Sequence, residues 1–111
     1  MKSIVQIARE SWACSKAKRE HLRRHPACAC CDCKASFLRL ALQAHHIVPV
    51  QSAPERAADP ANLITLCVGC HLRVGHMGNW HSWNGNLIET IMAIRQAWHT
   101  HAVRQLAGDK L

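Results

Sequence analysis

Two groups of closely spaced cysteines constrain this chain more than any other feature. Four cysteines fall within residues 28–33, and Cys67-Val-Gly-Cys70 adds a second group with C-x-x-C spacing. The chain has 111 residues, and domains of this size have a small core that metals or disulfides often reinforce. The opening stretch, MKSIVQIARESW, is too charged for a secretory signal. We therefore expect a cytoplasmic protein with reduced thiols, which at this spacing are typical of metal ligands.

Four thiolates from two such pairs suit a tetrahedral structural zinc ion. The Pro-Ala-Cys sequence before the first pair favours the first of two possible registers. The expected ligands are then Cys28, Cys31, Cys67 and Cys70. The other register, with Cys30 and Cys33 as the first pair, stays open. Some of the seven cysteines would then be buried free thiols, and the isolated Cys14 fits that description best.

The charge of the chain is positive and uneven. The formal net charge is +7, and residues 1–40 hold nine of the 14 Lys and Arg residues but only three of the seven acidic ones. This imbalance indicates a polyanionic partner, most often nucleic acid, although a basic helix face can also serve solubility alone. The expected backbone contacts are Lys16, Arg19, Arg23, Arg24 and Arg73. Such contacts increase affinity without selecting a sequence.

The periodicity predicts one domain over residues 1–111, with a core at 25–76 between two helices. A helix at 3–24 ends before Pro26, and a helix at 87–106 has a buried side formed by Leu87, Ile91, Ile94, Trp98 and Val103. Between them, residues 37–50 predict two short strands or one bent strand, and residues 63–67 (LITLC) predict another. No stretch approaches the roughly 18 apolar residues of a membrane span.

The histidine doublet His45-His46 is the most informative polar feature of the core. Adjacent side chains on a strand point to opposite faces, so the two imidazoles can take different roles. One can hold a metal ion, while the other, with the ordinary imidazole pKa of about 6.5, can take a proton from water. Asn62 follows after a loop, and His71 follows after a further strand and the second cysteine pair. This spacing can bring the four side chains together for phosphodiester cleavage, whereas a histidine pair alone is more often a coincidence.

At these residues the sequence resembles the HNH endonuclease family, in the form that carries a zinc-knuckle pair. The resemblance rests on HPACACC, AHHIVP and ANLITLCVGCH, and covers roughly residues 25–76. It implies a ββα-metal (His-Me finger) fold, a separate structural zinc and products with 5′-phosphate and 3′-hydroxyl ends. It also implies that His45 and His71 bind the catalytic metal, that His46 is the general base and that Asn62 positions the base or touches the metal.

The chain departs from the family pattern at two positions. Some members have another histidine four residues after the position of His71, where this chain has Gly75. His76, one residue later, would be rotated by about 140° on an α-helix, but can still bind the metal if the helix ends early. Asp32 replaces the glycine that usually follows the second knuckle cysteine, which leaves the register of the zinc site open.

These observations predict an α+β nuclease with flanking helices, acting on double-stranded DNA. The catalytic metal is Mg²⁺, Mn²⁺, Ni²⁺ or Zn²⁺, since histidine ligands with open positions suit all four. The resemblance to the compact single-domain form of this family implies a bacterial or phage source, with possible protein partners in a packaging or restriction complex. The alternative functions are a non-catalytic, zinc-stabilised DNA-binding module and a nuclease subunit active only within such a complex. Trp80 and Trp83 are expected to cap the core or to stack on bases.

Overall fold

A two-stranded antiparallel sheet lies at the centre of the molecule. The computed structural model describes residues 1–34 and 41–107. Strand β1 (Leu42–His46) pairs with β2 (Leu63–Cys67), so that Leu42 lies opposite Cys67 and His46 opposite Leu63. The strand predicted at 63–67 is confirmed, and β1 is the one strand described within 37–50. Residues 37–40 of that prediction lie outside the described part of the chain.

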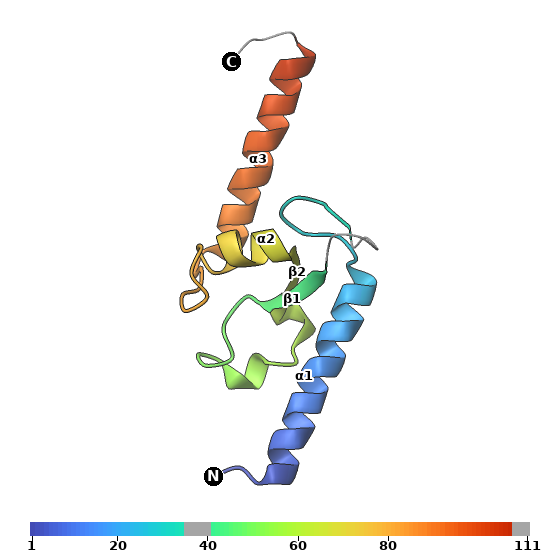
Figure 1. The fold of residues 1–111 in the computed structure, drawn as a ribbon, viewed down its shortest axis with the longest axis vertical. Helices are drawn as coiled ribbons and strands as arrows, with labels where there is room; N and C mark the ends of the chain where they lie inside the picture. The colour runs from blue at the N-terminus through green and yellow to red at the C-terminus, as the bar shows by residue number, and fades with distance from the viewer. Residues whose placement is uncertain (35–40, 108–111) are drawn as a thin grey trace.

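Two long helices flank the sheet and extend from it in opposite directions (Figure 1). Helix α1 spans Ile4–Arg24 and begins at Ser3, whose hydroxyl accepts a hydrogen bond from the backbone N–H of Gln6. Helix α3 spans Leu87–Leu106. Both agree with the predicted ranges to within a residue. The molecule measures 63 × 30 × 22 Å, and among the described residues no helix combines the length and apolar character needed to cross a membrane.

The apolar core is small and lies between the cysteines, β2 and the first turns of α3. Leu66, Leu87 and Ile91 are buried there against Cys28 and Cys30. A small core cannot cover a helix of 20 residues, so the rest of α3 extends past it.

The predicted buried side of the last helix is therefore wrong beyond its first turns. Ile94 is half-buried against the core, but Trp98 is 54 % exposed and Val103 is 50 % exposed. The helix itself is confirmed, but Trp98 and Val103 do not belong to the core.

A short helical segment follows β2 and completes the strand–strand–helix order of the core. Helix α2 (Val68–Cys70) continues into one π-helical turn at His71–Gly75. The loop between the strands contains two 3₁₀ turns, Pro54–Arg56 and Pro60–Asn62. The predicted fold class, a mixed α+β domain of ββα type with flanking helices, is confirmed.

Candidate functional site

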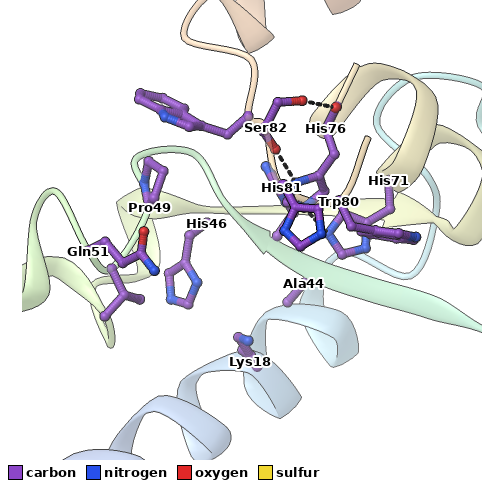
Figure 2. Close-up of a pocket in the computed structure, with 13 residues that line it drawn as sticks. Lys18, Ala44, His46, Pro49, Gln51, His71, His76, Trp80, His81 and Ser82 are labelled. Carbon is purple, nitrogen blue, oxygen red and sulfur yellow. Dashed lines mark hydrogen bonds between the residues drawn. The ribbon is translucent and has the colours of Figure 1, made fainter. Parts of the chain in front are cut away.

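The two adjacent histidines of β1 face different surroundings, as expected for neighbours on a strand. His45 is 6 % exposed, and its ring centroid lies 4.8 Å from that of His71 and 5.0 Å from that of His76. His46 Nε2 instead lies 2.8 Å from the carbonyl oxygen of Ala57. His45 and His46 nevertheless line one cavity of about 420 Å³. In Figure 2, His46 lies apart from His71 and His76.

The three clustered imidazoles are oriented so that their free nitrogens meet. Their ligand atoms all lie within 4.8 Å of one another. His71 Nδ1 donates to the side-chain oxygen of Gln43, and His76 Nδ1 donates to the carbonyl of Ser82 at 2.6 Å. The Nε2 atoms of His71 and His76 then face each other at 3.2 Å with lone pairs available. Two facing lone pairs are unfavourable unless a cation lies between them, so this donor set fits a divalent metal.

His76 reaches this cluster because the chain forms a π-helical turn. The backbone N–H of His76 bonds to the carbonyl of His71 at 3.0 Å, across five residues rather than four. This wider turn places the fifth residue close to the first, which an α-helix does not do. Gly75 is buried between the rings: a Cβ there would lie 3.3 Å from His45 Cε1 and 3.4 Å from His71 Cδ2.

The protonation of the cluster is shifted toward the form that binds metals. Burial, followed by the neighbouring imidazoles of His71 and His76, lowers the pKa of His45 to about 4. Burial also lowers the pKa of His71 to about 4, with smaller contributions from His76 and Lys18. Both rings are therefore neutral at pH 7, as metal ligation requires.

Asn62 is completely buried and holds the loop between the strands. Its side-chain amide donates to the carbonyls of Val48 at 3.0 Å and Arg56 at 3.2 Å, and its oxygen accepts from the N–H of Val48 at 2.8 Å. The expected bracing of the loop is present. None of these bonds goes to His46, so any effect of Asn62 on that ring passes through the loop backbone, including Ala57.

The cysteines form a second cluster, close to the start of α3. The sulfur atoms of four of them lie within 4.8 Å of one another and form a possible metal site: Cys28, Cys31, Cys33 and Cys67. The sulfurs of Cys31 and Cys67 are 3.8 Å apart, close to the spacing of about 3.8 Å between two sulfurs of a tetrahedral zinc site with 2.3 Å bonds. The cluster therefore fits such an ion.

This set differs from the expected ligands at one position. The fourth member of the group is Cys33, not the expected Cys70. The sulfur atoms of Cys31 and Cys33 are 3.2 Å apart. Cys70 remains adjacent, with its backbone N–H 3.5 Å from the sulfur of Cys67. Burial raises the pKa of Cys67, but the hydrogen bonds from Cys70 and the neighbouring thiols outweigh it and lower that pKa to about 7.

Asp32 occupies the knuckle turn in the left-handed conformation that usually requires glycine. Its φ is 63° and its N–H bonds to the carbonyl of Cys28 at 2.9 Å. Arg95 of α3 donates to the Asp32 carboxylate at 2.9 Å and to the carbonyl of Ala29 at 3.1 Å. The hydrogen bond from Arg95 also lowers the pKa of Asp32. Asp32 therefore adopts the backbone conformation of the turn and also forms an ion pair with Arg95 of α3.

The expected DNA-contacting residues lie on the surface, outside the cavity. Lys16, Arg19, Arg23, Arg24 and Arg73 are all exposed, and none lines the cavity around His45 and His46. Lys16 lies over the ring of Trp12, 5.3 Å from its centroid. The cationic side chain that does line the cavity is Lys18, which the charge pattern of the helix did not distinguish.

Trp80 and Trp83, which were expected to cap the core or to stack on bases, both line the histidine cavity. The Trp80 ring lies 5.1 Å from the ring of His71 and 5.0 Å from that of His76, and it covers them as a cap. Gln43 was the most recognisable of the missed residues, because it lies two positions before His45 and therefore on the same face of the strand.

Comparison with known proteins finds a family that part of the chain resembles. No curated protein and no solved structure matches the chain significantly. Residues 28–77 match the family of HNH endonucleases, and the match includes the cysteine cluster, both strands and the histidine cluster. The two antiparallel strands and the following helical segment are consistent with the ββα fold of that family. The match covers 50 of the 111 residues, and over this segment the chain is similar to the HNH endonucleases.

Proposed function

We propose that this protein is a metal-dependent endonuclease that hydrolyses phosphodiester bonds of double-stranded DNA. The observation that carries the proposal is the convergence of three imidazoles, His45, His71 and His76, in the same cavity as the separately held His46. The match of this segment to the HNH endonucleases supports it.

His46 is the proposed general base. A carbonyl oxygen can only accept a hydrogen bond, so the 2.8 Å contact with Ala57 assigns the proton of the neutral ring to Nε2. The lone pair of Nδ1 is then available for a proton from water. The resulting hydroxide attacks phosphorus, the bond from phosphorus to the 3′ oxygen breaks, and that oxygen takes a proton from solvent. The products are a 5′-phosphate and a 3′-hydroxyl.

His45, His71 and His76 are the proposed ligands of a divalent ion, which is Mg²⁺, Mn²⁺, Ni²⁺ or Zn²⁺. When bound, the ion polarises the phosphate and stabilises the charge on the leaving oxygen. Gln43 and Ser82 fix the tautomers of His71 and His76. Such outer partners orient metal ligands and raise their basicity.

Asn62 is a positioning residue in this proposal. It holds the loop on which Ala57 lies, and Ala57 in turn sets the tautomer of His46. Asn62→Ala would remove three buried hydrogen bonds, and cleavage would fall because the base loses its orientation.

A structural zinc ion in the cysteine cluster is the second proposed cofactor. Cys28, Cys31 and Cys67 are common to the expected set and to the observed group, and Cys33 and Cys70 both lie close enough to supply the fourth thiolate. Metal analysis of the purified protein should find about one tightly bound zinc per chain. Cys33→Ser and Cys70→Ser, each measured alone, identify the fourth ligand by loss of that zinc, and a zinc-free protein that folds normally would refute the proposal.

A plasmid-nicking assay tests the nuclease function. Supercoiled plasmid should be nicked with Mn²⁺, Mg²⁺, Ni²⁺ or Zn²⁺ and remain intact with EDTA. His46→Ala should abolish nicking because it removes the proposed general base. His99→Ala changes an exposed histidine of α3 that lies away from the cavity, and should cut like the wild type. Nicking by His46→Ala at the wild-type rate would show that the base is misassigned.

A further inference from the structure

Lys18 is the cation on the wall of the histidine cavity, and we propose that it binds the scissile phosphate of the DNA strand. It lines the cavity together with His45, His46, His71 and His76. Figure 2 shows it on the side of α1 that faces Ala44 and His46. The inference rests on the proposed nuclease function and adds a substrate-binding residue from outside the matched family segment, which begins at residue 28.

The orientation of α1 explains why Lys18 faces the cavity. Cys14 lies one turn earlier on the helix, and its sulfur is 3.8 Å from Nε2 of His46. Residues four apart share a face of a helix, so Lys18 follows Cys14 along the side next to β1. Lys16 is rotated from Lys18 by about 200° and is exposed over Trp12 instead.

The charge of Lys18 has no anionic partner within the histidine cavity, although Glu10 and Glu55 line a neighbouring cavity that Lys18 also borders. Within residues 1–34 and 41–107, none of the ion pairs involves Lys18, and no aspartate or glutamate lines the cavity. Lys18 is also half-buried, which makes an unpaired ammonium group more costly than it would be on an open surface.

A metal ion on the proposed ligands would increase the excess of positive charge at the cavity. Three neutral imidazoles leave the charge of a divalent ion uncompensated, and Lys18 adds another positive charge at the same cavity. A phosphodiester supplies the missing negative charge and has two non-bridging oxygens, so one can face the ion while the other accepts a hydrogen bond from the ammonium group. The cavity is therefore built for an anionic substrate.

The test compares Lys18→Gln with Lys18→Arg and with Arg9→Gln, a matched loss of one charge about 180° around the same helix. Arg9 is exposed and lies outside the cavity. Steady-state cleavage of a short duplex with Mn²⁺ gives kcat and KM. Lys18→Gln should lower kcat by roughly 10- to 100-fold, the effect of losing one charged hydrogen bond in the transition state. Lys18→Arg should recover most of the rate, and Arg9→Gln should leave kcat within about twofold. Equal kcat values for Lys18→Gln and the wild type would overturn the proposal, as would an equal loss in Arg9→Gln.

A binding experiment separates failure of this inference from failure of the nuclease function. If the wild type does not cut DNA, the proposed function fails, and the affinity for a thymidine dinucleotide with Mn²⁺, followed by tryptophan fluorescence, decides the role of Lys18. Arg9→Gln is again the control, since Arg9 does not line the cavity that would hold this single phosphodiester. Weaker binding by Lys18→Gln alone supports the inference. Unchanged binding by Lys18→Gln, or no binding by the wild type, contradicts it.

Discussion

At the scale of single residues, Gly75 shows how closely the histidine cluster is packed. An alanine there would bring its Cβ within 3.3 Å of His45 Cε1 and 3.4 Å of His71 Cδ2, so both rings would have to move. We expect Gly75→Ala to weaken metal binding by about 10-fold, as other changes just outside a ligand set do. Isothermal titration with Mn²⁺ measures the effect.

Gly69→Ala is the matched control for this change. A Cβ at Gly69 meets nothing within 4 Å, and alanine favours a helix more than glycine does. The control should bind Mn²⁺ like the wild type. Equal affinities for all three proteins would show that the cluster is not packed as described.

The lowered pKa values of His45 and His71 predict a loss of stability in acid. Both are about 4 in the folded protein, against about 6.5 in an unfolded chain. Between these values the unfolded chain binds more protons, so the free energy of unfolding falls as the pH drops from about 6.5 toward 4. His45→Gln removes one of these groups and should lose less stability over this interval. Parallel pH dependences of the unfolding temperature for variant and wild type would contradict the pKa shift.

Sequence patterns predict individual residues well only where the chemistry depends on spacing along the chain. His45, His46 and His71 follow from their positions around the strands and the second cysteine pair. Lys18, Gly75 and the tautomer of His46 depend on how α1, the π-helical turn and the loop at Ala57 meet in space. A single sequence contains no direct signal for such contacts.

At the scale of elements, the knuckle turn depends on one residue with an unusual backbone angle. Asp32 has a φ of 63°, which aspartate and glycine adopt more readily than β-branched residues do. Asp32→Val should therefore lower the midpoint of thermal unfolding by roughly 5–10 °C. Asp32→Asn also loses the ion pair with Arg95 but tolerates the backbone angle, and should change the midpoint much less. Equal effects of the two variants would mean that the ion pair, not the backbone, is decisive.

The two long helices were predictable because their periodicity extends over many residues. Helices α1 and α3 match the sequence pattern, and the helix start at Ser3 has an ordinary capping residue. The short strand β2 also matches its predicted range. The π-helical turn at His71–Gly75 was not predictable, because it differs from an α-helix only in its hydrogen-bond spacing. That difference decides whether His76 joins the cluster.

At the scale of the whole molecule, α3 is anchored at one end only. Leu87 is 1 % exposed and Trp98 is 54 % exposed. Leu87→Ala should cost about 2–4 kcal/mol of unfolding free energy, whereas Trp98→Ala should stay within about 0.5 kcal/mol. Urea denaturation, monitored by circular dichroism, measures the unfolding free energy of both variants and the wild type. A large loss in Trp98→Ala would show that the outer part of α3 is covered in solution.

The two clusters are linked along the chain by α2, which leads from Cys67 to His71. Cys67 ends β2, Cys70 ends α2, and His71 follows directly. Anything that displaces the cysteines therefore displaces a proposed ligand of the catalytic metal.

The central claim is that His45 belongs to a metal site and that His46 does not. Titration with Mn²⁺, run in parallel with cleavage on His45→Ala and His46→Ala, tests it most directly. His45→Ala should lose both metal binding and cleavage. His46→Ala should bind Mn²⁺ with wild-type affinity and still fail to cut DNA. Loss of Mn²⁺ binding in His46→Ala, or its retention in His45→Ala, would contradict the account.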